Sequence, residues 1–136
     1  MITAVDTSVL LDLLIEQAPH GKASLDALRK AGGQGRLIIC ETVVAEIWPS
    51  LRSPETVAEF LEALNLDFVP STLEVAQRAG NTYSQYLANK GMAKRVLPDF
   101  LVAAHALMFA DSLLARDRGY YRTYFSDLHL VEPQAP

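Results

Sequence analysis

Cysteine is almost absent from this sequence, with Cys40 alone among 136 residues. A single cysteine cannot form a disulfide within the chain, which excludes the class of small proteins stabilised by internal disulfides. A chain of this length buries roughly 65–70% of the surface that its unfolded form exposes, enough for a core without crosslinks. We therefore expect a globular protein of a reducing compartment, with residues 1–136 forming one domain.

Positive charge is also scarce, because twelve Lys and Arg face sixteen Asp and Glu, for a net charge of −4. This balance excludes binding of nucleic acid by bulk charge, although a local basic patch or a bound metal is compatible with it. Long apolar runs are missing, since the longest uncharged helical stretch, residues 100–110, is too short to span a bilayer. Residues 1–5 lack the positive charge typical of a signal peptide. The sequence thus predicts a cytoplasmic protein with no membrane association.

What the chain does contain is an alternation of short apolar runs and helix-like segments, with half of its residues hydrophobic. Alternation of this kind is typical of a parallel sheet that is covered by helices on both faces. We predict a three-layer α/β/α domain with a central, mostly parallel sheet. The predicted strands are residues 2–5, 37–40, 66–69, 112–115 and 129–131.

Three local signals give sharper expectations for the helices. Gly32 and Gly33 predict the end of the second helix, because glycine commonly follows a helix. Pro49 is expected to end or kink the next helix. Ser71 and Glu74 have the spacing of a capping box, which predicts that a long helix begins at Ser71.

Four acidic residues stand where a predicted strand ends or a predicted helix begins: Asp6, Glu46, Asp99 and Asp117. In an open parallel sheet these places converge on one crevice, at the carboxyl ends of the strands. Carboxylates gathered there repel one another, and a hard divalent cation such as Mg²⁺ or Mn²⁺ is the usual remedy. The four acids therefore predict a metal-dependent enzyme that acts on phosphate esters, with all four as metal-binding and catalytic residues.

Each acid taken alone also has a structural explanation. Asp6 suits a helix N-cap, and Asp99 suits the first turn of a helix, where the dipole favours a negative charge. Asp117 could be a turn residue paired with Arg116 or Arg118. Glu46 is harder to explain in this way, because its neighbours are apolar and an acid is costly to bury unless it is paired or bound to metal.

Residues next to these acids are candidates for supporting roles. The hydroxyls of Thr7 and Ser8 could fix a water, a metal ligand or a phosphate oxygen, or could form a local turn. Basic residues flank the third and fourth acids and could hold an RNA backbone, or could be ordinary solvated surface. These basic residues are Lys94, Arg95, Arg116 and Arg118.

The segments around the four acids resemble those of PIN domains and, within that family, the VapC toxins of bacterial toxin–antitoxin pairs. The matching segments are residues 5–11, 41–48, 97–106 and 113–121. The order and the spacing of all four acids agree with the family pattern. Two departures are Ser8, where the family often has asparagine, and Pro49, which lies near Glu46.

This resemblance implies a PIN-like domain with an acidic Mg²⁺ pocket and endoribonuclease activity. It also implies a small VapB-like antitoxin that blocks the pocket, and a homodimer. On this interpretation Asp6 and Asp99 bind the metal directly, while Glu46 and Asp117 complete the pocket through water or a second ion. Arg116 and Arg118 could accept a carboxylate of the antitoxin instead of RNA.

Two other functions remain open from the residues alone. A phosphatase of the haloacid-dehalogenase type would use an aspartate after the first strand, but it usually needs a second aspartate at the position of Ser8. A non-catalytic acidic module, such as a phosphoacceptor receiver domain, would need a lysine and a second early acidic pair, which are not evident. Aspartyl-phosphate formation would favour either of these over a nuclease.

Overall fold

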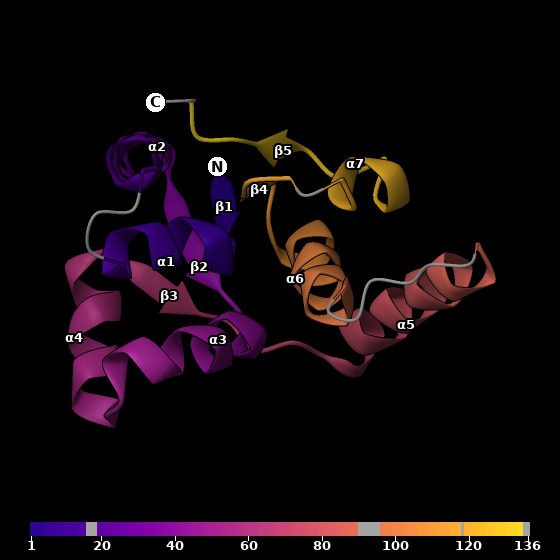
Figure 1. Ribbon diagram of the computed structural model, residues 1–136, viewed down its shortest axis with the longest axis horizontal. Coiled ribbons are helices and arrows are strands. Elements are labelled where there is room, and N and C mark those ends of the chain that lie inside the picture. The colour runs from indigo at the N-terminus through magenta and orange to yellow at the C-terminus, as the bar shows by residue number, and fades with distance from the viewer. Residues whose placement is uncertain (16–18, 90–95, 118, 135–136) are drawn as a thin grey trace.

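The computed structural model describes residues 1–15, 19–89, 96–117 and 119–134 (Figure 1). Its five strands form one sheet in the order β3-β2-β1-β4-β5, and every pairing in it is parallel. The predicted α/β class with a central parallel sheet is therefore confirmed. The strands are β1 (Ile2–Val5), β2 (Arg36–Ile39), β3 (Leu66–Phe68), β4 (Ser112–Leu114) and β5 (Leu130–Val131).

Helices fill the connections between the strands and form the outer layers. They are α1 (Thr7–Leu14), α2 (Gly21–Gln34), α3 (Glu41–Leu51), α4 (Pro54–Ala63), α5 (Leu73–Ala88), α6 (Val96–Phe109) and α7 (Tyr121–Tyr124). Within the described ranges, none of these helices has the length and apolar character needed to cross a membrane.

The winding of the chain reverses between β1 and β4. From β1 the chain moves through β2 to β3 on one side, and from β4 it moves to β5 on the other. Because parallel crossovers are right-handed, the helices after β1 and β2 cover one face and those after β3 and β4 cover the opposite face. In Figure 1, α1, α2 and α4 lie in the left half of the view and α5, α6 and α7 in the right half. Ligands of such sheets bind outside the carboxyl ends of the strands at this reversal.

The core lies on both faces of the two central strands. Val5, Leu113 and Leu114 are buried to at least 99%. On the α6 side, Phe100 is fully buried in a cluster of aromatic rings whose neighbouring centroids lie 5.4–6.4 Å apart. The other members of this cluster are Tyr83, Tyr86, Tyr120, Tyr124 and Phe125.

The prediction that α2 ends at Gly32 and Gly33 is wrong, because α2 continues to Gln34. Neither glycine has backbone close enough to require it, whereas a Cβ at Gly35 would lie 1.9 Å from the Met1 carbonyl oxygen. The chain can turn from α2 into β2 beside Met1 only because position 35 lacks a side chain.

Two further helix boundaries differ from the predictions. Pro49 lies inside α3, which closes two residues later when the Arg52 amide donates to the Trp48 carbonyl at 2.8 Å. The N-cap of α5 is Thr72 and not Ser71, since the Thr72 hydroxyl accepts from the Val75 amide. The Ser71 amide instead donates to the Glu41 carboxylate at 2.9 and 3.1 Å, a tertiary contact that sequence spacing could not show.

Candidate active site

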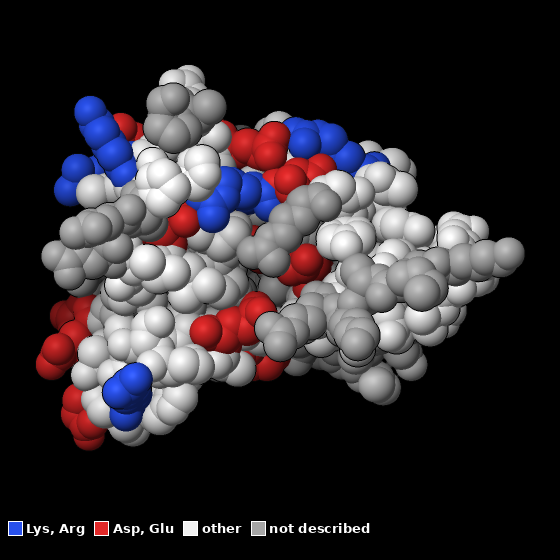
Figure 2. Space-filling view, in the orientation of Figure 1, with Lys and Arg blue, Asp and Glu red and all other residues white. Residues whose placement is uncertain are grey.

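The strand ends at the reversal of winding are held together by the backbone. The Asp6 amide, just after β1, donates to the carbonyl of Leu114 at the end of β4, at 2.9 Å. Asp117 follows β4 in this same region, and α3, which carries Glu46, begins just after the carboxyl end of β2. Asp99 lies in the first turn of α6, the helix whose last residues lead to the start of β4. Figure 2 shows acidic side chains along the middle of this view, with basic side chains beside them.

Asp6 is buried, with 5% of its surface exposed, and caps α1. Its Oδ2 atom accepts from the Ser8 hydroxyl at 2.6 Å and from the Ser8 amide at 3.2 Å. Its Oδ1 atom accepts from the Tyr121 hydroxyl at 3.0 Å. Among the described residues, all of its donors are therefore neutral groups, which orient the carboxylate without cancelling its charge.

Glu46 is exposed, so the prediction that it lies in a buried apolar setting is wrong. Val43 and Ile47 line the buried face of α3, and Glu46 faces away from that face. The Thr7 hydroxyl donates to Glu46 Oε1 at 2.7 Å. Thr7 thus ties an exposed carboxylate of α3 to the start of α1, directly beside Asp6.

Asp99 is half-buried in the first turn of α6, and the negative charge of Asp99 acts on the Tyr121 phenol. Burial raises the pKa of the Tyr121 phenol far above its ordinary value of 10.0, and the negative charges of Asp6, Asp99 and Glu46 raise it further. The phenol therefore stays protonated at all physiological pH values and acts as a donor. Asp6 accepts a hydrogen bond from this hydroxyl, and, among the described contacts, the charges of Asp99 on α6 and Glu46 on α3 act on it without a hydrogen bond from Tyr121.

Asp117 has a different environment from the other three acids. Its side chain is 6% exposed, its Oδ1 accepts from the amides of Gly119 and Tyr121, and its Oδ2 pairs with Arg122 at 3.1 Å. Arg122 also pairs with Glu132 at 2.8 Å, and Glu132 accepts from the Asp117 amide at 3.0 Å. The cation paired with Asp117 in the described structure is therefore Arg122 rather than Arg116.

The expected basic contacts are only partly described. Arg116 forms an ion pair with the buried carboxylate of Asp12, which also accepts from the Ser24 hydroxyl at 2.5 Å. The Arg116 amide donates to Ser8 Oγ at 3.3 Å. Lys94, Arg95 and Arg118 lie outside the described residues.

Sequence reasoning missed two polar residues that the fold brings to this region. Asp12 lies within an apolar run of leucines, which is the same signal that was applied to Glu46, and it could have been found that way. Tyr121 has no local signal, because its partner Asp6 is 115 positions away in the sequence. Only the adjacency of β1 and β4 reveals this contact.

The donor atoms suit a hard divalent cation, because they are carboxylate and hydroxyl oxygens. Within residues 1–15, 19–89, 96–117 and 119–134, no group of three or more His, Cys, Asp or Glu is arranged to hold a metal ion. Glu46 is exposed and Asp99 half-buried, so rotation of these side chains toward Asp6 is what a shared ion would require.

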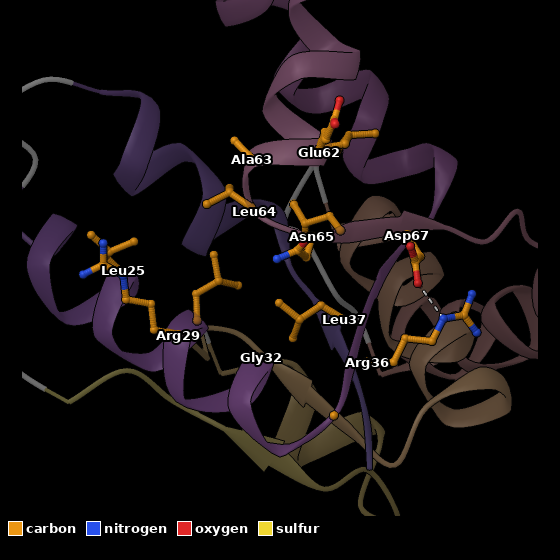
Figure 3. A pocket seen from close by; sticks show the side chains of 14 residues that line it. Leu25, Arg29, Gly32, Arg36, Leu37, Glu62, Ala63, Leu64, Asn65 and Asp67 are labelled. Atoms are coloured by element: carbon orange, nitrogen blue, oxygen red, sulfur yellow. Dashed lines mark hydrogen bonds and ion pairs between the residues drawn. The ribbon is translucent and has the colours of Figure 1, made fainter.

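A separate concavity of about 680 Å³ lies at the opposite end of the sheet, between α2, α4 and the amino ends of β2 and β3 (Figure 3). Leu28, Leu37 and Leu66 are buried residues of its lining, and an ion pair of 2.7 Å joins Arg36 to Asp67. None of the four acids lines it, so this cavity is distinct from the acidic region.

Comparison with solved structures identifies proteins of the same fold. VapBC2 from Rickettsia felis bound to a DNA fragment from their promoter aligns with a TM-score of 0.73 and 17% identity over 97% of this chain and 98% of that chain. A toxin–antitoxin complex from Klebsiella pneumoniae aligns with a TM-score of 0.71 and 17% identity over 98% and 99%. FitAcB from Neisseria gonorrhoeae aligns with a TM-score of 0.67 and 19% identity over 98% of each chain.

The sequence comparisons give the family. Among curated proteins, no sequence matches this chain significantly. The family model described as PIN domain matches residues 3–126, a span that includes most of β1, all of β2 to β4 and all four acids. Because this match extends over most of the chain, the protein belongs to the PIN domain family, a family of nucleases.

Proposed function

We propose that this chain is a Mg²⁺-dependent endoribonuclease, the toxin of a type II toxin–antitoxin pair, which hydrolyses RNA phosphodiester bonds. The observation that carries the proposal is the burial of Asp6 among neutral donors, with Glu46 tied beside it through Thr7, at the reversal of winding where parallel sheets bind ligands. The PIN family match supports the hydrolytic chemistry. Residues 1–136 act as one domain in this proposal.

The residues divide the work in this pocket. Asp6 and Asp99 would hold Mg²⁺ or Mn²⁺ directly, and Glu46 and Asp117 would complete the pocket through water or a second ion. When bound, the cation supplies Lewis-acid polarisation of the phosphodiester and acidifies a water. Ser8 orients Asp6, and Thr7 orients Glu46, whose exposed carboxylate can accept a proton from the attacking water.

Partners follow from the same comparisons. Solved proteins of this fold include VapBC and other toxin–antitoxin complexes, which supports a small VapB-like antitoxin as the partner of this chain. We propose a cytoplasmic homodimer. Lys94, Arg95, Arg116 and Arg118 would contact RNA or the antitoxin, and the Arg116 side chain remains 31% exposed beside its ion pair with Asp12.

The phosphatase and receiver alternatives gain no support from the structure. The phosphatase would need a second aspartate at position 8, which is a serine whose hydroxyl donates to Asp6. The receiver domain would need a lysine and a second early acidic pair, which are not evident. The family match over residues 3–126 also favours the nuclease.

Cleavage of labelled total RNA by the purified protein tests the proposal. The assay is run with Mg²⁺, Mn²⁺ or EDTA, on the wild type, Asp6→Asn and Asp99→Asn, with Asp26→Asn as a matched control because Asp26 is an exposed acid on α2. We expect metal-dependent cutting that EDTA and both pocket variants abolish and that Asp26→Asn retains. Cutting in EDTA would contradict metal dependence, and wild-type cutting by Asp99→Asn would remove Asp99 from the site.

A further inference from the structure

Tyr121 is hydrogen-bonded to two of the four acids, Asp6 and Asp117. Its hydroxyl donates to Asp6 Oδ1 at 3.0 Å, and its amide donates to Asp117 Oδ1 at 3.2 Å. Tyr121 is 3% exposed and lies on α7, the helix that follows β4. One buried residue therefore sets the relation between the carboxylates that follow β1 and β4.

The two oxygens of Asp6 are not equivalent. A carboxylate offers about four lone-pair sites, two on each oxygen. Oδ2 already accepts two hydrogen bonds, from the hydroxyl and the amide of Ser8, whereas Oδ1 accepts one, from Tyr121. Among the described contacts, Oδ1 is thus the oxygen with a lone pair left for a cation, and the Tyr121 hydroxyl fixes the other lone pair of that same atom.

We propose that Tyr121 is a positioning residue of the acidic pocket, whose hydroxyl orients Asp6 so that Oδ1 coordinates the divalent cation. This inference rests on the proposed function, because it presumes that Asp6 is a metal ligand. Hydrogen-bonding partners of metal-bound carboxylates fix ligand orientation, and their loss typically weakens metal affinity or activity by about 10–100-fold. Without the Tyr121 hydroxyl, only the two hydrogen bonds from Ser8 to Oδ2 would orient the Asp6 carboxylate, and Oδ1 would be free to rotate.

The test compares Tyr121→Phe with Tyr124→Phe. Both changes remove one phenolic oxygen from α7, but the Tyr124 hydroxyl has no hydrogen bond among the residues that the structure describes, and its ring packs against Phe100 and Tyr86. Mn²⁺ binding is measured by isothermal titration calorimetry on the folded full chain, below the melting temperature of each variant. We expect Tyr121→Phe to raise the Kd for Mn²⁺ by roughly 10-fold or more, and Tyr124→Phe to leave it unchanged.

The outcomes separate this inference from the proposed function. If the wild type binds Mn²⁺ and Tyr121→Phe binds it equally well or more tightly, the inference is overturned and the nuclease proposal stands. If the wild type binds no Mn²⁺, the metal site fails and takes the inference with it. A merely structural hydroxyl would lower the melting temperature of Tyr121→Phe without changing its Kd for Mn²⁺, and this result also overturns the inference.

A second measurement uses only the wild type and does not depend on how a variant folds. A buried phenol that donates to a carboxylate should show a slowly exchanging hydroxyl proton by NMR. We expect the Tyr121 hydroxyl proton to persist when Mg²⁺ is added. Its loss on adding Mg²⁺ would mean that the ion displaces the hydroxyl, which would overturn the positioning role.

Discussion

Asp6 and Asp117 follow neighbouring parallel strands and are both almost buried, yet they are held in opposite ways. Asp6 accepts hydrogen bonds from neutral hydroxyl and amide groups, while Asp117 pairs with the cationic side chain of Arg122. A carboxylate held by neutral donors keeps its full negative charge for another cation. A carboxylate paired with arginine has much of that charge already balanced. The two acids are alike in the sequence pattern but are not equally ready to bind metal.

The hydrogen-bonded cluster of Asp117, Arg122 and Glu132, which we call the Asp117 cluster, also depends on exposed charges. Arg122 is 60% exposed and bridges Asp117 and Glu132, so its ion pairs lie at the surface and are screened by salt. Hydrogen bonds from Tyr121 and Ser8 to Asp6 are buried and do not depend on a second ionised group. Activity should therefore be most sensitive at Asp6, and sensitivity to salt and pH should be concentrated around Asp117.

The largest expected difference is in catalysis by Asp6→Asn and Asp117→Asn. Because Asp6 is a proposed direct ligand, we expect its substitution to lower the initial rate of RNA cleavage by more than about 100-fold, beyond the usual effect of losing a supporting group. Asp117→Asn should lower it by only about 10-fold, since its role is indirect. Equal losses in the two variants, measured at saturating Mg²⁺, would show that the ion pair with Arg122 opens during catalysis.

A smaller effect is expected from Ser8→Ala, which removes the 2.6 Å hydrogen bond to Asp6 Oδ2. Loss of one orienting donor should weaken cleavage by about 10-fold, at the lower end for groups that support metal ligands. Ser24→Ala is the comparison variant, because it breaks a hydroxyl–carboxylate bond of the same kind to Asp12, which among the described residues pairs with Arg116 and with none of the four acids. If both variants lose stability but neither loses activity, Ser8 has only a structural role.

The pH dependence of stability should report on the Asp117 cluster through Glu132. The Asp117 amide and Arg122 lower the pKa of Glu132 below its ordinary value of 4.5. Ionised Glu132 therefore stabilises the fold above pH 4.5, and this contribution is lost as pH falls through the lowered value. Thermal melts of wild type and Glu132→Gln should differ at neutral pH and converge in acid. A constant difference at every pH would contradict this assignment.

The smallest expected effect is that of salt on Arg122→Gln. Its ion pairs are exposed, so the variant should melt slightly lower than wild type in dilute buffer, and the gap should close as NaCl is added. Arg52→Gln provides a comparison, since the Arg52 guanidinium group bonds to a backbone carbonyl. A gap for Arg122→Gln that persists in high salt would mean that Arg122 acts through packing rather than charge.

Much of the fold was predictable because its signals are local. Residues 2–5 and 112–115 are short apolar runs, and burial on both faces of a parallel strand requires such runs. Asp6 and Asp99 were candidates from the sequence because Asp6 stands at a junction of strand and helix and Asp99 stands at a helix start, and their roles stay a prediction. The error at Ser71 arose because Glu41, a residue 30 positions earlier, takes its amide.

Chain order, apolar patterning and the places of the four acids were determined by the sequence alone, since they depend on residues close together along the chain. The tertiary structure decided which acids share surroundings and which donors hold them. Thr7 donates a hydrogen bond to Glu46, Tyr121 donates one to Asp6, and Arg122 donates one to Asp117. The first two of these contacts join residues far apart in the sequence, which parallel strand pairing and helix packing bring together. The geometry of a hydrogen bond depends on positions in space, and the spacing of residues along the chain does not give those positions.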